Sequence, residues 1–196
     1  MATDEHAPAA GFATAAGTRA RLIAVVGGES TGKSTLVADL VAALPGLAVS
    51  ETLRMWVAEH GRVPTQAEQW QVMAAQATRE QAALARAAEQ GLGWVVSDGS
   101  LFMTAIYSLL YYDDRDLLPD ALAAAAQAAL VVWCDADIPW ESDDGQRDGS
   151  QWREDAQRLI GEVLTEAGRD VDLRWLQVSG SPEQRVAAVV MALAVR

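Results

Sequence analysis

The feature that most constrains the fold is an apolar run that passes through a glycine-rich turn directly into a helix. The run RLIAVV at residues 21–26 is rich in β-branched residues, and GGESTGKS follows it. A continuous apolar run of this length is typical of a parallel strand buried on both faces. The next segment predicts a helix over residues 32–44, which Pro45 and Gly46 end. Because parallel strands need crossover connections, this stretch favours an α/β architecture.

The rest of the chain repeats the alternation of short apolar runs and helical segments. Further strands are predicted at residues 47–50, 93–98, 130–134 and 173–179. Helices are predicted between them, one capped by Thr65 and the last by Ser181 with Pro182 in its first turn. The pattern predicts a three-layer α/β fold, with a five-stranded parallel sheet and helices on both faces. We expect residues 21–196 to form this one domain and residues 1–20 to form a flexible tail.

The composition narrows the functional classes. The chain has 196 residues, and none of its stretches approaches the roughly 18 consecutive apolar residues of a membrane span. Its net charge of −12 argues against a nucleic-acid surface, which needs clustered Lys and Arg. Cys134 is the only cysteine, so a disulfide framework is excluded and a buried, unreactive thiol is expected. We therefore expect a soluble, cytoplasmic protein with neither membrane nor nucleic-acid partners. The oligomeric state stays open, a homodimer included.

The glycine-rich turn matches the phosphate-binding P-loop pattern, Gly27-x-x-x-x-Gly32-Lys33-Ser34. Backbone N–H groups in such a turn, together with the positive end of the following helix, hold phosphate. Lys33, the only lysine in the chain, is expected to neutralise the β- and γ-phosphates, and the Ser34 hydroxyl to ligate Mg²⁺. The predicted cofactors are ATP and Mg²⁺. The predicted nucleotide-binding residues in the turn are Gly27, Gly28, Glu29, Ser30, Thr31, Gly32, Lys33, Ser34 and Thr35.

The residues outside the turn argue against two classes of P-loop protein. Translation-type GTPases read guanine through Asn/Thr-Lys-x-Asp, which this chain cannot contain because its single lysine is Lys33. Hydrolytic ATPases usually end a strand in Asp-Glu, and the glutamate prepares a water for attack. Here the strand at residues 93–98 ends in Asp98, followed by Gly99 and Ser100. Asp98 can hold Mg²⁺ through its water shell, but no carboxylate adjoins it. A small-molecule kinase therefore fits better than a switch GTPase or a hydrolase.

Small-molecule kinases place a carboxylate after the second strand, where it can accept the proton of a substrate hydroxyl. Glu51 occupies that position. Arg54 falls near it if a helix begins there, because residues three apart share a helical face. Glu51 is thus a candidate catalytic and substrate-binding residue, with Arg54 and Asp98 as further substrate contacts. A surface ion pair between Glu51 and Arg54 is the alternative interpretation.

The segment at residues 137–155, DIPWESDDGQRDGSQWRED, predicts a lid over the transferring phosphate. Arg147 and Arg153 are its candidate catalytic arginines, since cations on such a lid stabilise the charge on the phosphoryl oxygens. A merely solvated acidic loop is the alternative. The fold class is then that of a P-loop NTPase of the nucleoside-kinase type with a lid.

Two weaker candidates lie elsewhere in the chain. Trp70, on a predicted helix, is a candidate for stacking on a nucleobase-like ring; the alternative is a core or half-buried tryptophan. Gly180 and Pro182 follow the last predicted strand, where an adenine ring often rests in such folds.

Four segments together resemble the ribosylnicotinamide kinase domain of the bacterial NAD-biosynthesis regulator. They are GGESTGKSTL, ETLR at residues 51–54, VVSDGSLFMTA, and residues 140–149 with DDGQR. The resemblance covers residues 20–195 and implies ATP-dependent phosphorylation of the 5′-hydroxyl of nicotinamide riboside, giving nicotinamide mononucleotide. It implies functional roles for Lys33, Ser34, Glu51, Arg54, Asp98 and Arg147.

The chain departs from this family in two respects. The family often has Asp-Thr-Asp where this chain has Asp98-Gly99-Ser100, so the second carboxylate is missing. Multifunctional members also carry adenylyltransferase and DNA-binding domains, for which 196 residues leave no room, so the resemblance implies a stand-alone kinase module. The missing carboxylate leaves a second hypothesis open, an ATP-binding sensor that acts through a protein partner. A kinase for another nucleoside is a third.

Overall fold

The computed structural model describes residues 19–139 and 150–195. Residues 1–18 of the predicted tail (1–20) and residues 140–149 of the predicted lid, with Arg147, lie outside the described residues.

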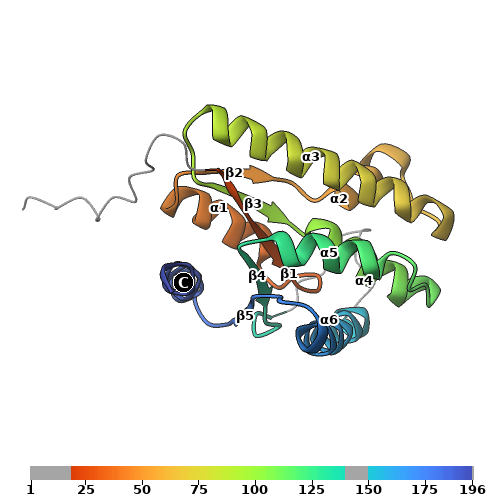
Figure 1. Ribbon diagram of the computed structural model, residues 1–196. Helices are drawn as coiled ribbons and strands as arrows, with labels where there is room; N and C mark the ends of the chain where they lie inside the picture. Colours follow the sequence, from red (N-terminus) through yellow and green to blue (C-terminus); the bar gives the residue numbers. More distant parts are fainter. Residues whose placement is uncertain (1–18, 140–149, 196) are drawn as a thin grey trace, which may run out of the picture.

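Five parallel strands form one sheet in the order β2-β3-β1-β4-β5 (Figure 1). They are β1 (Arg21–Val26), β2 (Gly46–Val49), β3 (Trp94–Asp98), β4 (Leu130–Cys134) and β5 (Trp175–Val178). The predicted five-stranded parallel sheet is confirmed, and each strand lies within two residues of its predicted bounds.

Helices cover both faces of the sheet (Figure 1). One face carries α1 (Lys33–Ala43) and α7 (Pro182–Ala194). The other carries α3 (Gln69–Glu89), α4 (Ser100–Tyr112) and α6 (Ser150–Asp170), with α5 (Leu118–Gln127) packed against α4. Between β2 and α3 the chain forms α2 (Thr52–His60) and the short 3₁₀ helix η1 (Gln66–Glu68). The predicted three-layer α/β fold is therefore confirmed.

The central strand β1 shows why its sequence is continuously apolar. Side chains alternate across a strand, so Ile23 and Val25 pack with α1 and α7, while Ala24 and Val26 pack with α4 and α6. All four side chains are at most 1% exposed. A strand that is buried on both faces has no solvent side on which polar residues would alternate.

The two predicted caps are present in the structure. Ser181 begins α7: its Oγ accepts the N–H of Gln184 at 3.4 Å, and its own N–H donates to Gln184 Oε1 at 2.8 Å. Thr65 bonds to Glu68 at 2.8 Å through both its N–H and its hydroxyl, so it caps η1 rather than α3 directly. These capping boxes fix where the chain enters each helix.

Among the described residues, none of the helices combines the length and the apolar character that crossing a membrane requires. Cys134 is fully buried, and burial raises the pKa of its thiol to about 11, as expected for an unreactive cysteine.

Parallel order brings the carboxyl ends of the strands to one edge of the sheet. The connection from β1 leads to α1 on one face, and that from β3 leads to α4 on the other. In open α/β sheets such a switch point forms the crevice that binds ligands. The residues that follow β1, β2, β3 and β4 therefore meet there.

Candidate functional site

The glycine-rich turn connects β1 to α1 and has two positions that require glycine. Gly27 and Gly32 have φ values of +152° and +80°. A Cβ atom would lie 2.7 Å from the Thr31 hydroxyl at Gly27, and 2.9 Å from Ile138 Cδ1 at Gly32. Both the backbone conformation and the close packing therefore exclude larger residues.

Lys33 is held inside this turn. Its side-chain Nζ donates to the carbonyl of Gly28 at 2.9 Å, and the Thr31 hydroxyl donates to the same carbonyl at 2.8 Å. Lys33 is only 6% exposed. The ammonium group thus lies within the turn rather than extending into solvent.

An open pocket of about 340 Å³ lies over the turn, and we call it the phosphate pocket. Arg54, from α2, brings a second cation to it, and the segment after β4 closes one side. The N-terminus of α1 faces this pocket, so backbone N–H groups and the helix dipole both favour an anion there. The lining residues are Ser30, Thr31, Gly32, Lys33, Ser34, Thr35, Arg54, Ile138 and Pro139.

Ser34 and Asp98 form a pair of oxygen donors beside the pocket. The Ser34 hydroxyl donates to Asp98 Oδ2 at 2.6 Å. Asp98 is 6% exposed, and its other oxygen, Oδ1, is buried and has no hydrogen-bond partner among the residues that the structure describes. A buried carboxylate oxygen without a partner is costly, and hydroxyl and carboxylate oxygens are ligands that Mg²⁺ prefers. The two residues therefore fit the predicted Mg²⁺ site.

Glu51 is the N-cap residue of α2, and Arg54 lies one turn later, as the sequence predicted. Arg54 Nη2 lies 3.7 Å from Glu51 Oε2. Glu51 makes no capping hydrogen bond with its side chain, and its carboxyl group packs against Gly99. The side chain of Glu51 is only 13% exposed, against 57% for Arg54. The pair is therefore not a simple surface ion pair, because its carboxylate is largely shielded from water.

Burial raises the pKa of the Glu51 carboxyl above its ordinary value. The nearby charge of Asp98 also raises it, while Lys33 and Arg54 lower it. These couplings join the base candidate, the metal candidate and the phosphate-binding lysine in one electrostatic cluster.

Arg153, predicted as a lid arginine, lies on α6 and contacts two other segments. It is 6% exposed, and its Nη2 donates to the carbonyls of Ala136 and Ile138 at 2.5 and 2.7 Å. Its side chain also packs against Gly28. The residue thus joins α6 to the turn and to the segment after β4. It is not among the residues that line the phosphate pocket, and its predicted role in stabilising phosphoryl charge stays a prediction.

The other predicted site residues, Trp70, Gly180 and Pro182, do not line the phosphate pocket. Trp70 is 59% exposed on α3, so the alternative that placed it in the core is wrong. Gly180 lies in the loop between β5 and α7, where its N–H donates to Asp137 Oδ2 at 2.5 Å. Pro182 opens α7 and borders a groove between α1 and α7.

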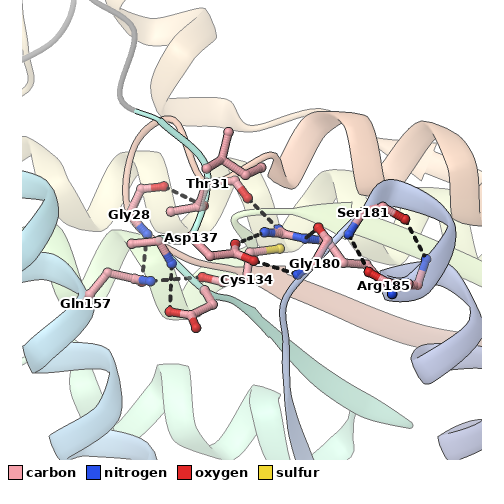
Figure 2. Close-up of polar contacts among 12 residues, drawn as sticks. Gly28, Thr31, Cys134, Asp137, Gln157, Gly180, Ser181 and Arg185 are labelled. Atoms are coloured by element: carbon pink, nitrogen blue, oxygen red, sulfur yellow. Dashed lines mark hydrogen bonds and ion pairs between the residues drawn. The ribbon is translucent and has the colours of Figure 1, made fainter.

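Sequence reasoning missed a buried arginine beneath the turn (Figure 2). Arg185 is 3% exposed; its Nη1 donates to the Thr31 carbonyl at 2.7 Å and its Nε to the Gly180 carbonyl at 3.1 Å. Its Nη2 pairs with Asp137. This Arg185–Asp137 clamp ties the turn to the segments after β4 and β5. One signal was available: Arg185 lies four residues before buried Val189, on the inward face of α7.

Gln157, on α6, was also missed (Figure 2). Its Oε1 accepts the N–H of Gly28 at 3.1 Å and the indole N–H of Trp133 at 2.8 Å. Its Nε2 donates to the carbonyl of Cys134 at 2.9 Å. A single amide thus holds the start of the turn against the end of β4.

The clamp leads to a stability prediction. We expect Asp137→Ala to lower the free energy of unfolding, measured in urea without nucleotide, by about 2 kcal/mol. The mutation leaves the buried Arg185 guanidinium without its counter-ion, but the loss is smaller than the roughly 3–5 kcal/mol of a wholly buried pair because the Asp137 side chain is 32% exposed.

Asp155→Ala is the matched control for this prediction. It removes a carboxylate whose ion-pair partner among the described residues is exposed Arg158, and should cost at most about 0.5 kcal/mol. Equal losses in the two variants would contradict the importance assigned to the clamp.

The family model described as an AAA domain matches residues 22–185. No curated protein sequence matches the chain. Among solved structures, NadR in complex with NR is 19% identical with a TM-score of 0.69, and NadR in complex with NAD and AMP-PNP is 18% identical with a TM-score of 0.71. Each match covers 91% of this chain but 53% and 51% of the NadR chains, so this chain spans about half their length.

Other solved structures with this fold are nucleoside and nucleotide kinases. Deoxyadenosine kinase from M. mycoides is 13% identical, with a TM-score of 0.61 over 89% of this chain and all of its own. Thymidylate kinase from Candida albicans is 15% identical, with a TM-score of 0.65 over 90% of this chain and 92% of its own. At these identities the likeness shows the fold, which is that of the P-loop nucleoside and nucleotide kinases.

Proposed function

The chain belongs to the AAA-domain family, and we propose that it is an ATP-dependent small-molecule kinase whose acceptor is the 5′-hydroxyl of nicotinamide riboside. The observation that carries the proposal is the shielded carboxylate of Glu51, which lies in the same electrostatic cluster as Lys33 and Asp98. A base in this position can take a proton from an alcohol while the phosphate pocket holds the donor.

The phosphate pocket supplies the donor side of the reaction. The N–H groups at the start of α1 bind the β-phosphate, and Lys33 with Arg54 balances the negative charge of the transferring group. Ser34 and Asp98 would hold Mg²⁺, which would supply neutralisation of the phosphate charge. Arg147 and Arg153 are proposed to add to this charge balance, and Gly180 and Pro182 to contact adenine.

Glu51 supplies the acceptor side. Its carboxylate accepts a hydrogen bond from the acceptor hydroxyl, orients the oxygen towards the γ-phosphorus and takes the proton as the new bond forms. A raised pKa makes this carboxylate a stronger base than a solvated glutamate.

An aromatic cluster of side chains from α4 and α6 supports an acceptor with a flat ring. Tyr107 is buried, and burial, and then the charges of Glu51 and Glu29, raise the pKa of its hydroxyl. Tyr107 stacks with Tyr111 at 5.9 Å between ring centroids, and Tyr111 contacts Trp152 at 5.0 Å. Electron-rich ring faces attract a cationic ring such as nicotinamide in its riboside. Trp70 is the other proposed stacking residue.

The similarity of the fold to NadR supports this choice of acceptor, since one of those structures is a complex with NR. The deoxyadenosine and thymidylate kinases support the broader class, a kinase for nucleosides or nucleotides.

The test is ADP release from ATP and Mg²⁺, with nicotinamide riboside or with a panel of ribo- and deoxyribonucleosides. We expect nicotinamide riboside to stimulate release at least about tenfold above the rate without acceptor, and nicotinamide mononucleotide to accumulate in equal amount. Stimulation by another nucleoside alone would retain the kinase class and reject this acceptor. Binding of ATP without any stimulation would reject the kinase and favour the ATP sensor.

A further inference from the structure

A buried polar network lies behind the site, and none of its members has a role in the reaction described so far. Its side chains come from α2, α3 and β3 and are at most 8% exposed. Hydrogen bonds join all four, and we call them the α3 network. The members are Thr52, Gln76, Glu80 and Ser97.

One half of the network holds the beginning of α2. The first N–H groups of a helix have no partner within the helix, and Glu51 does not cap α2 with its side chain. Gln76 Oε1 instead accepts the N–H of Thr52 at 2.9 Å and its hydroxyl at 2.5 Å. The residue that adjoins Glu51 is therefore fixed at two atoms by a side chain from α3, and the Glu51 carboxylate stays free of the helix end.

The other half holds the end of β3. Gln76 Nε2 donates to the Ser97 hydroxyl at 2.9 Å and to Glu80 Oε1 at 3.3 Å, and Ser97 in turn donates to Glu80 Oε1 at 2.6 Å. Ser97 adjoins Asp98. The two ends of the Gln76 amide thus have different partners: its oxygen faces the donors of Thr52, and its nitrogen faces acceptors.

We propose that Gln76 is a positioning residue that sets the spacing between Glu51 and Asp98, the two carboxylates of the proposed reaction. No other described hydrogen bond joins the residue after Glu51 to the residue before Asp98 through one side chain. The inference rests on the proposed function, because it assigns Glu51 to the acceptor and Asp98 to the metal. Buried networks with every member bonded are rigid, which suits this task.

The test replaces the amide with an apolar side chain of similar length. We expect Gln76→Met to lower kcat for phosphorylation of nicotinamide riboside by about 10- to 100-fold, because a displacement of about 1 Å can cost that much. The affinity for ATP should stay within about twofold, since Gln76 does not line the phosphate pocket. Gln81→Met, the same change at an exposed position of α3, should leave kcat unchanged.

Two further variants separate positioning from general stability. Thr52→Val removes the hydrogen bond from the Thr52 hydroxyl to Gln76 and should lower kcat. Thr52→Ser keeps that hydrogen bond and should keep kcat near the wild-type value. This pair also carries the test if Gln76→Met does not fold. In the Glu51→Gln background, Gln76→Met should have little further effect on kcat, because the spacing that Gln76 sets matters only while Glu51 acts as the base.

The outcomes distinguish this inference from its premise. A wild-type protein that phosphorylates none of the acceptors overturns the proposed function, and the inference with it. An active wild-type protein whose folded Gln76→Met and Thr52→Val variants keep kcat within twofold overturns the inference alone. Additive losses from Gln76→Met and Glu51→Gln would also overturn it, because they would mean that Gln76 acts independently of Glu51.

Discussion

Replacing Lys33 with alanine is expected to lower kcat for phosphoryl transfer by about 1,000-fold or more. Lys33 is the only lysine of the chain, is 6% exposed, and is held at 2.9 Å by the Gly28 carbonyl. In the proposed reaction, its ammonium group stabilises charge as the γ-phosphoryl group transfers. Removing one such preorganised donor typically costs about 10²- to 10³-fold, and here the lost group also carries a full charge.

The measurement is single-turnover transfer at saturating ATP, together with the dissociation constant for ATP. Arg158→Ala is the control, because it removes an exposed cation from α6 and should leave both values unchanged. The single lysine also permits a chemical test: an amine-acylating reagent should modify Lys33 more slowly when ATP is bound. A Lys33→Ala variant that keeps more than a tenth of the wild-type kcat would contradict the assigned role.

Replacing Glu51 with glutamine is expected to lower kcat by about 10²- to 10⁴-fold, the range that a positioned general base supplies. Glutamine has nearly the same shape, so its packing against Gly99 should persist while the proton acceptor is lost. ATP affinity should be nearly unchanged, because Glu51 does not line the phosphate pocket. The matched control is Glu59→Gln, which neutralises an exposed glutamate on the same helix.

The pH dependence provides a second measurement on Glu51. Its carboxyl group must be ionised to accept a proton, and burial raises its pKa. The rate should therefore fall as the pH decreases through this raised pKa, at a higher pH than for a solvated glutamate. Glu51→Gln should lose this acidic limb. A variant that loses ATP binding and turnover equally, or that keeps the limb, would show that Glu51 is not the base.

Much of the fold and part of the site could be predicted from short segments. The strand β1, the turn and α1 follow one another without a gap, so their residues dictate local structure and phosphate chemistry together. The separation of Glu51 and Arg54 by three residues similarly predicted their contact once α2 began at Thr52. In each case the interacting groups are close in sequence, and backbone geometry alone brings them together.

The supporting residues could not be predicted in this way. Arg185 reaches the carbonyl of Thr31 across 154 residues of sequence, and Gln157 reaches Gly28 across 129. Gln76 joins α2 to β3 only because α3 packs over both. Nothing in the local sequence distinguishes Gln76 from the exposed Gln81 on the same helix except which face of α3 each occupies.

By itself, the sequence determined the alternation of strands and helices and the phosphate-binding turn, because hydrophobic periodicity and glycine conformation act over a few residues. Tertiary structure alone decided which polar side chains become buried partners of that turn and of Glu51. The physical reason is that a buried polar group must find its hydrogen-bond partner in space, and in this fold the partners of Arg185, Gln157 and Gln76 come from distant segments.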